Sequence, residues 1–231
     1  MDFKIIKEIL PYSSDDAFLK LEAFYHLLVS ENQKYNLTSL ISEEEVLVKH
    51  FYDSLFPFKD LDLTGKKVLD IGSGAGFPIV PLCLLNNRMV GYAIDSNNKK
   101  IFFLNKVKNE LGMDNLHIIN GRAEILAHKT FRDSFDIVTA RAFAPSTIEL
   151  EILAPFVKVG GALIALKSKH YLEEKEDILR VAKKLNLTLV NTSNFILPNN
   201  MGERYVLTFK KHRENSKIYP RDYSLIKNKP L

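Results

Sequence analysis

The sequence has a single cysteine, Cys83, in a chain of 231 residues. One cysteine excludes an internal disulfide, so the fold cannot depend on covalent cross-links. The six histidines do not combine with Cys83 or with one another at the spacing of a zinc site. We therefore expect a fold held together by its hydrophobic core, with no bound metal.

A long hydrophobic run is also missing. The longest apolar stretch, from Pro78 to Leu85, is far shorter than the ~20 residues that a membrane-spanning helix needs. The first residues, MDFKIIKEILPY, alternate charged and apolar side chains, unlike the continuous apolar segment of a secretory signal. These absences predict a protein without a membrane segment that works in the cytoplasm, and we expect it to be a monomer.

The composition is not that of a disordered chain, because 46% of the residues are hydrophobic and 26% are charged. The formal net charge of +4 is concentrated near the C-terminus, where residues 210–231 carry seven basic and two acidic side chains. Tyr219 and Tyr223 lie among these basic residues. Such a tail suits contact with phosphates and stacking on bases. A solvated tail without a partner is the alternative.

The N-terminal part of the chain predicts two amphipathic helices. Residues 15–30 place apolar side chains at helical spacing after SSDD, a cluster of helix-capping residues. Residues 43–55 repeat the apolar pattern. We expect residues 1–64 to form a helical extension that precedes the main fold and packs with it as one unit.

From residue 65 onward, short apolar strands alternate with helices, the pattern of a parallel sheet covered on both faces. The predicted strands are Val68 to Ile71, Met89 to Asp95, Leu116 to Asn120, Phe135 to Ala140, Ala162 to Lys167, Leu187 to Phe195 and Tyr205 to Lys210. The last two strands have no helix between them and should pair as an antiparallel hairpin. We therefore expect an α/β domain over residues 65–231, with a seven-stranded, mostly parallel sheet whose last strand is antiparallel.

Capping residues mark the helices between these strands. Pro78 suits the first turn of the helix after the first strand. Ser96 can cap a helix over residues 97–111, and Ser146 can cap a helix that ends at Val157.

The first strand leads into VLDIGSGAGFP, in which Asp70 precedes glycines at alternate positions, beginning with Gly72 and Gly74. Ligands bind beyond the carboxyl ends of strands in open parallel sheets, and glycines let the main chain approach a ligand closely. The spacing departs from the dinucleotide fingerprint, because Phe77 follows and no third glycine stands at the required interval. The turn therefore predicts a nucleotide-type ligand other than NAD.

Asp70 favours a cationic ligand, because a carboxylate at the strand end repels a pyrophosphate by ~1 kcal/mol or more. S-adenosylmethionine offers an ammonium, a sulfonium and no phosphate, and its carboxylate can accept N–H groups at a helix start. Asp95, at the end of the second strand, suits a bidentate bond to two ribose hydroxyls. We expect Asp70, Gly72, Gly74 and Asp95 to bind S-adenosylmethionine.

The chain contains, in order, the segments YNLTSL, HFYDSL, VLDIGSGAGFP, AIDSNNKKIFFL, GRAE, FDIVTARAFAP and YPRDYS. These segments resemble the RsmG (GidB) family of bacterial 16S ribosomal RNA methyltransferases, and the resemblance covers most of the chain. The family has a class I, Rossmann-like methyltransferase fold and transfers a methyl group from S-adenosylmethionine to N7 of one guanine near the decoding centre. The resemblance implies that cofactor here, and 16S rRNA or the small ribosomal subunit as partner.

By position, the resemblance implies cofactor contacts at Gly72, Phe77, Ala123, Glu124 and Arg141. The basic side chains that we expect at the RNA are Lys167, Lys210, Lys211 and Arg221. The chain departs from the common family pattern at Ser168, where a glycine usually follows the lysine, and at Asp95, where glutamate is frequent.

Missing residues narrow the chemistry further. Methylation of an exocyclic amine generally uses a polar-Pro-Pro-aromatic loop after the fourth strand, and the loop here is RAFAP. Methylation of a pyrimidine carbon uses a nucleophilic cysteine, whereas Cys83 falls within an apolar helix. Guanine N7 has a lone pair and no proton, so its methylation needs alignment but no general base. We assign no catalytic residue, and we expect Phe77, Phe143 and Arg141 to shape the base pocket.

His50, in HFYDSL, is explained as well by a structural bond to Asp53 or to a carbonyl group as by catalysis, and we assign it no chemistry. Two other functions stay open at this point. A methyltransferase that acts on a small molecule or a protein would bind the same cofactor and ignore RNA. A non-catalytic RNA-binding module would keep the basic surface without binding S-adenosylmethionine.

Overall fold

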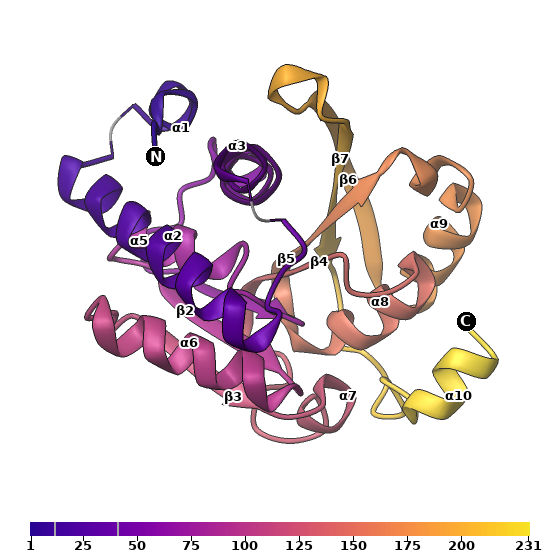
Figure 1. Ribbon diagram of the computed structural model, residues 1–231. Helices are drawn as coiled ribbons and strands as arrows, with labels where there is room; N and C mark the ends of the chain where they lie inside the picture. Colours follow the sequence, from indigo (N-terminus) through magenta and orange to yellow (C-terminus); the bar gives the residue numbers. More distant parts are fainter. Residues whose placement is uncertain (12, 41) are drawn as a thin grey trace.

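The computed structural model describes residues 1–11, 13–40 and 42–231. Its centre is a seven-stranded sheet with the order β3-β2-β1-β4-β5-β7-β6 (Figure 1). The strands are β1 (Lys67–Ile71), β2 (Val90–Asp95), β3 (Leu116–Asn120), β4 (Phe135–Arg141), β5 (Val157–Ser168), β6 (Leu187–Ile196) and β7 (Glu203–Lys211). β1 to β5 are parallel, and β7 runs antiparallel to its neighbours β5 and β6. The predicted fold class and the antiparallel last strand are confirmed.

Helices cover both faces of this sheet (Figure 1). They are α5 (Ile79–Leu85) and α6 (Asn98–Glu110) on one face, and α7 (Ala123–Leu126), α8 (Ser146–Leu153) and α9 (Lys175–Lys184) on the other. Side chains alternate along each strand, so Val68 of β1 joins the core beneath α5 and α6, whereas Leu69 joins the core beneath α8 and α9. Both faces of the central strands are therefore apolar, as a covered parallel sheet requires.

The N-terminal helices form a further layer over α5 and α6. They are α1 (Lys4–Ile9), α2 (Asp15–Tyr35), α3 (Glu43–Val46) and α4 (Asp53–Leu55), with a π-helical segment (Leu47–Tyr52) between the last two and a 3-10 turn (Phe56–Phe58) after them. α2 contacts both α5 and α6. Its Phe24 packs against Phe77 and Phe103 with ring centroids 5.1 and 6.3 Å apart. The predicted division into a helical extension (residues 1–64) and an α/β domain (residues 65–231) stays a proposal. The aromatic cluster contains residues from both parts and joins them.

Some helix boundaries differ from the prediction. The cap of α6 is Asn97 rather than Ser96, and the Asn97 side chain accepts a main-chain N–H group in the first turn. Ser146 is the first residue of α8 rather than its cap. α8 ends at Leu153, earlier than expected, because Pro155 has no N–H group to continue the helix and the chain turns into a 3-10 segment.

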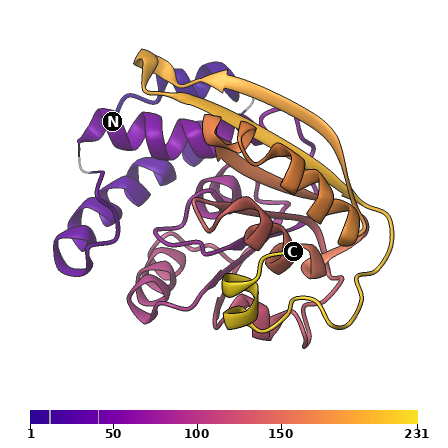
Figure 2. The same cartoon turned by 90° about the vertical axis from the view of Figure 1, so that its right-hand side faces the viewer.

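The chain after β7 returns to the face of the sheet that carries α7 and α8. It leads to α10 (Tyr223–Asn228), which packs on α8 (Figure 2). Ile226 of α10 is fully buried. The basic C-terminal segment is thus folded onto the domain.

Within the described ranges, no helix combines the length and the apolar character needed to cross a membrane. The same residues contain no group of three or more His, Cys, Asp or Glu side chains that could hold a metal ion.

Gly91 of β2 lies where α5 packs closely on the sheet. A Cβ atom at Gly91 would overlap the Sγ atom of Cys83 and lie 3.2 Å from Cδ1 of Ile79. Cys83 and Ile79 are both buried. Gly91→Ala should therefore lower the free energy of unfolding by about 1–3 kcal/mol, measured by urea denaturation.

Cys83→Ala removes the overlapping sulfur atom and is the matched second variant. We expect the double variant to be destabilised by less than the sum of the two single variants. Additive effects would contradict the close approach of α5 to β2.

Candidate functional site

The candidate site lies at the carboxyl ends of the parallel strands. The strand order reverses between β1 and β4, and ligand crevices form at such a switch point in open α/β sheets. A cavity of about 170 Å³ opens there, and we call it the first cavity. Its lining includes Gly72, Asp95, Ala123, Glu124 and Phe143, from the loops after β1 to β4, and Tyr223 of α10.

The glycine turn after β1 forms the floor of the first cavity. Gly72 and Gly74 have φ angles of +70° and +55°, which glycine adopts without strain. A Cβ atom on Gly72 would lie 2.6 Å from Cδ2 of Phe143, so the Phe143 ring covers the turn directly. The glycine at position 72 is required both by backbone conformation and by this close approach.

The carboxylate of Asp95 fixes the turn against the end of β2. Its Oδ2 accepts a hydrogen bond from the N–H of Gly74 at 2.9 Å, and its Oδ1 accepts one from the N–H of Asn97 at 2.8 Å. Each carboxylate oxygen has a further lone pair for a ligand hydroxyl. Asp95 thus lines the first cavity in a fixed orientation, and its predicted ribose contact would add to bonds that already exist.

Asp70 lies at the base of the turn and is fully buried. Among the described residues, no donor forms a hydrogen bond with either oxygen atom of its side chain. Burial raises the pKa of the Asp70 carboxyl well above its usual range. An unpartnered buried carboxyl group is costly. The first cavity is lined by Gly72 and not by Asp70, so the structure does not bring the Asp70 side chain to the cavity, and its attraction for an ammonium group stays a prediction.

The GRAE segment after β3 forms one wall of the first cavity. Ala123 is buried at the start of α7, and Oε1 of Glu124 accepts a 2.8 Å bond from Nε of Arg122. The guanidinium group of Arg122 lies 4.6 Å from the centroid of the Tyr223 ring. Residues from two distant parts of the chain therefore meet at this wall.

Arg141, at the end of β4, joins the sheet to the N-terminal helices. Its guanidinium group donates to the carbonyl oxygen of Lys49 and to Nδ1 of His50, both at 2.8 Å. Its Nη1 lies 3.6 Å from Oδ2 of Asp53, which also pairs with Arg204 of β7 at 3.1 Å. The π-helical segment is thus held against the ends of β4 and β7.

His50 is a neutral member of this network. The guanidinium group of Arg141 can only donate, so Nδ1 of His50 accepts, and Nε2 carries the proton and donates to Oγ1 of Thr38 at 2.8 Å. The imidazole stacks on the ring of Phe77 with centroids 4.6 Å apart. Burial, and then the positive charges of Arg141 and Lys100, lower the pKa of His50 to about 3. Both nitrogen atoms are occupied, which agrees with a structural role.

A second cavity of about 430 Å³ adjoins the first. Its lining includes Lys49, Arg141, Ala144, Lys167, Ser168 and Arg204. Ala144, in the loop after β4, lines both cavities. The strand ends therefore carry a smaller cavity over the glycine turn and a larger, basic cavity beside it.

The structure brings four of the eight predicted cofactor residues together in the lining of the first cavity: Gly72, Asp95, Ala123 and Glu124. Arg141 lines the second cavity instead. The side chain of Phe77 is packed in the core and is 3% exposed, so it does not shape a base pocket. A ligand contact at Phe77 would have to come through its main chain.

Lys211 is not available to RNA, contrary to the prediction. Its side chain is buried, and Nζ donates to Oδ1 of Asp133 at 2.6 Å and to the carbonyl oxygens of Ala154 and Val157 at 3.0 and 2.7 Å. Burial lowers the pKa of Lys211. This lysine holds the end of β7 in place.

The other three predicted RNA contacts differ in position. Arg221 donates through Nε and Nη2 to the buried Glu151, at 2.7 Å each, and so has a structural use. Lys210 is exposed, but it lies six residues along β7 from Arg204 and hence ~20 Å from the second cavity. Lys167 lines that cavity and pairs with Glu149 at 2.7 Å.

Sequence reasoning missed Tyr223 as a residue of the first cavity, and Lys49, Asp53 and Arg204 as residues of the second. All four come from outside the loops that follow the parallel strands. The segments HFYDSL and YPRDYS, which contain Asp53 and Tyr223, were the available signal. Neither segment shows in sequence what it packs against.

Comparison with known proteins places these features in a family. Residues 18–201 match the family model described as rRNA small subunit methyltransferase G (GidB). A ribosomal RNA small subunit methyltransferase G from Staphylococcus epidermidis is 41% identical over 213 residues, which cover 92% of this chain and 89% of the relative. A protein of the same name from Carboxydothermus hydrogenoformans is 40% identical over 211 residues, which cover 91% of this chain and 90% of the relative.

Solved structures of lower identity share the fold. TYW2 from M. jannaschii, in complex with AdoMet, is 18% identical with a TM-score of 0.53 over 69% of this chain and 74% of that one. The ribosomal protein L11 methylase from Lactobacillus delbrueckii subsp. bulgaricus is 13% identical with a TM-score of 0.53 over 70% and 77%. At these identities the likeness concerns the fold alone.

The low pKa of His50 makes the stability of the protein depend on pH. The unfolded chain takes up a proton at its histidines near pH 6.5, whereas folded His50 stays neutral down to about pH 3. The unfolded state therefore binds more protons as the pH falls through this window, and folding stability decreases. Between pH 7.5 and 5.5, His50 should reduce the free energy of unfolding by about 1.4 kcal/mol.

Urea denaturation at the two pH values measures this loss, and His50→Gln should lose about 1.4 kcal/mol less than the unchanged protein. His26→Gln, which removes an exposed histidine of α2, is the matched control and should keep the loss of the unchanged protein. Equal losses in both variants would show that His50 is charged in the folded state.

Proposed function

Because the chain belongs to the rRNA small subunit methyltransferase G family, we propose that it transfers the methyl group of S-adenosylmethionine to N7 of a guanine in 16S ribosomal RNA. Methyl transfer to small-subunit ribosomal RNA is the activity of the family. The guanine N7 atom, the cofactor contacts and the position in the RNA are the proposed refinements. The observation that carries the proposal is the pair of adjoining cavities at the strand ends, within a chain that matches the family over most of its length.

The first cavity has the features that S-adenosylmethionine requires. Gly72 lines the cavity at the end of the turn, where its main chain can approach a ligand, and Asp70 lies beneath it with a buried carboxyl group that has no hydrogen-bond partner among the described residues. Asp95 presents a fixed carboxylate to ribose hydroxyls, and the main chain at Ala123 and Glu124 can read an adenine edge. We propose that these residues hold the cofactor, which supplies an electrophilic methyl group on its sulfonium.

The second cavity suits the target base. Its lining includes the basic side chains of Lys49, Lys167 and Arg204, each paired with a carboxylate. Asp53 is the one acidic residue among the described residues of this lining, so basic groups are in excess where an RNA segment would lie. Ala144, shared by the two cavities, brings the acceptor next to the donor. We propose that the guanine enters here, with its N7 edge turned towards the first cavity.

The residues of the site align the reactants rather than exchange protons. Guanine N7 carries no proton, so no base is needed to activate it. His50, which is bonded to Arg141 of the second cavity, has both nitrogen atoms bonded and is neutral. The network of Arg141, Asp53 and Arg204 keeps the wall of the second cavity rigid. Rigid positioning of this kind supplies much of the rate of a transfer reaction.

We propose further that the protein acts as a monomer in the cytoplasm, on 16S rRNA or on the small subunit. A methyltransferase for a small molecule or a protein is the competing function. It would use the first cavity in the same way, but it would have no need of the basic lining of the second. The basic lining therefore favours RNA.

The purified protein should transfer radiolabelled methyl groups from S-adenosylmethionine to unmodified 16S rRNA or small subunits. Chain cleavage at N7-methylguanine should then map the label to one guanine. Cofactor binding without incorporation into RNA at low salt would contradict the RNA substrate. Label at any atom other than guanine N7 would contradict the chemistry.

Ser168→Trp, at the end of β5, fills the second cavity with a bulky ring. It should lower kcat/KM for RNA by about 10- to 100-fold, because the base is displaced, and leave the Kd for S-adenosylmethionine unchanged. Val159→Trp, at an exposed position on the other end of β5, is the matched control and should keep full activity. Equal activities of the two variants would place the acceptor elsewhere.

A further inference from the structure

The C-terminal segment, residues 212–231, forms part of the first cavity. It leaves β7 at the opposite end of the sheet from the cavities, because Lys210 pairs with Ala162 near the start of the regular β5 pairing. It then runs back to α10 (Figure 2). Tyr223, the first residue of α10, lines the first cavity. A tail that served only to bind RNA would have no need to return to the cofactor side of the molecule.

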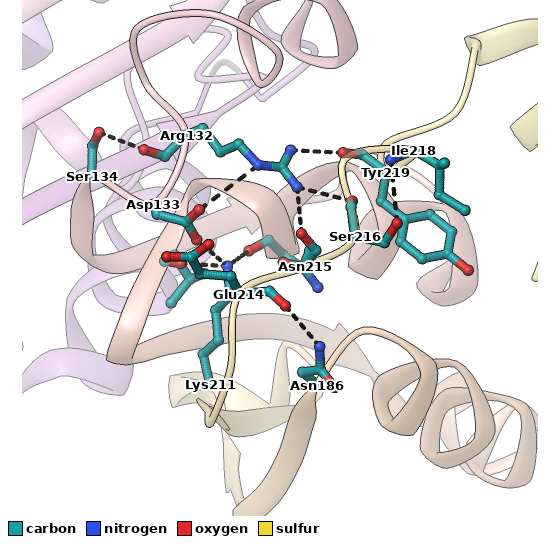
Figure 3. Close-up of polar contacts among 12 residues, drawn as sticks. Arg132, Asp133, Ser134, Asn186, Lys211, Glu214, Asn215, Ser216, Ile218 and Tyr219 are labelled. Atoms are coloured by element: carbon teal, nitrogen blue, oxygen red, sulfur yellow. Dashed lines mark hydrogen bonds and ion pairs between the residues drawn. The ribbon is translucent and has the colours of Figure 1, made fainter.

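Arg132, between α7 and β4, holds this segment by its main chain. Its Nη1 donates to the carbonyl oxygen of Tyr219 at 2.8 Å, and its Nη2 donates to those of Asn215 and Ser216 at 2.9 Å each. Figure 3 shows the guanidinium group reaching into the bend of the segment. Three carbonyl groups bonded to one cation fix the path of the chain rather than the identity of its side chains.

Further contacts continue this attachment up to α10. Nε2 of His128 donates to the carbonyl oxygen of Pro220 at 2.7 Å. Arg221 forms a bidentate pair with Glu151, whose side chain is fully buried, and Ile226 of α10 is fully buried as well. The chain is therefore held in place both before and after Tyr223.

Tyr223 contributes the aromatic surface at the GRAE wall. Its ring lies 4.6 Å from the guanidinium group of Arg122, which is itself bonded to Glu124. Phe143 lines the same cavity, but its ring covers Gly72 of the turn, whereas the Tyr223 ring lies at the GRAE wall. Asp95 is the proposed ligand of the ribose. The part of S-adenosylmethionine that extends from the ribose to this wall is the adenine. A planar purine gains most from contact with an aromatic side chain.

We propose that Tyr223 binds the adenine of S-adenosylmethionine and that Arg132 positions it there, so that the C-terminal segment is a wall of the donor site. This inference rests on the proposed function. It assigns the segment to the cofactor rather than to RNA, which its charge alone had suggested. Arg122 holds one side of the Tyr223 ring, and the adenine packs in the cavity that this pair encloses.

Isothermal titration with S-adenosylhomocysteine and with adenosine tests the assignment. Tyr223→Ala should raise the Kd of both ligands by the same factor, about 5- to 30-fold, because the lost contact is to the half that they share. Tyr223→Phe keeps the ring and should stay within about twofold of the unchanged protein. Leu225→Ala, at an exposed position of α10, is the matched control and should also stay within about twofold.

Three outcomes would overturn the inference. An unchanged Kd for Tyr223→Ala would remove the adenine contact while leaving the proposed function intact. A raised KM for RNA at unchanged cofactor Kd would assign Tyr223 to the RNA. Failure of the unchanged protein to bind S-adenosylhomocysteine would overturn the proposed function itself.

Arg132→Met tests the positioning role, since it releases the three carbonyl groups without touching the first cavity. Its Kd for adenosine should rise by a factor no larger than that of Tyr223→Ala. The double variant should bind adenosine no more weakly than Tyr223→Ala alone, because Arg132 acts through Tyr223. Multiplied losses in the double variant would show that Arg132 acts by general destabilisation and not through the ring.

Discussion

The guanidinium group of Arg141 is the point on which the arrangement of the site depends. It is largely buried at the end of β4, and a buried cation is tolerated only when its donors are paired. Its partners come from the π-helical segment, and Asp53 of that region carries the link onward to Arg204 of β7. The N-terminal helices are thereby fixed at the strand ends, where they contribute Lys49 and Asp53 to the lining of the second cavity.

The central strands β1, β2 and β4 were predictable because they are covered on both faces and are therefore short, apolar runs. β3 begins and ends at the predicted residues, and the hairpin of β6 and β7 follows from the missing helix between them. The first half of β5 was missed because residues 158–160 are exposed and carry a lysine and a glycine, which do not resemble a buried strand. The π-helical segment was read as ordinary helix, since the apolar spacing of residues 43–55 does not distinguish the two.

The part of the candidate site that is local in sequence was also predictable. The glycine turn, Asp95 and the GRAE segment each follow a strand directly, and parallel strands bring their carboxyl ends to one edge. Contacts between distant segments were not predictable from one sequence. Lys211 has the pattern of a basic tail residue, and nothing local reveals that Asp133, 78 residues earlier, encloses its ammonium group. Phe77 was misjudged for the same reason, because the helix that buries it lies outside the motif.

The fold of the C-terminal segment has a consequence for how the protein matures. Because synthesis proceeds from the N-terminus, Gly72, Asp95 and Glu124 leave a translating ribosome before Tyr223. The lining of the first cavity therefore stays incomplete until the segment after β7 has been made and α10 has folded onto α8. A nascent chain can build most of the sheet before this lining is finished.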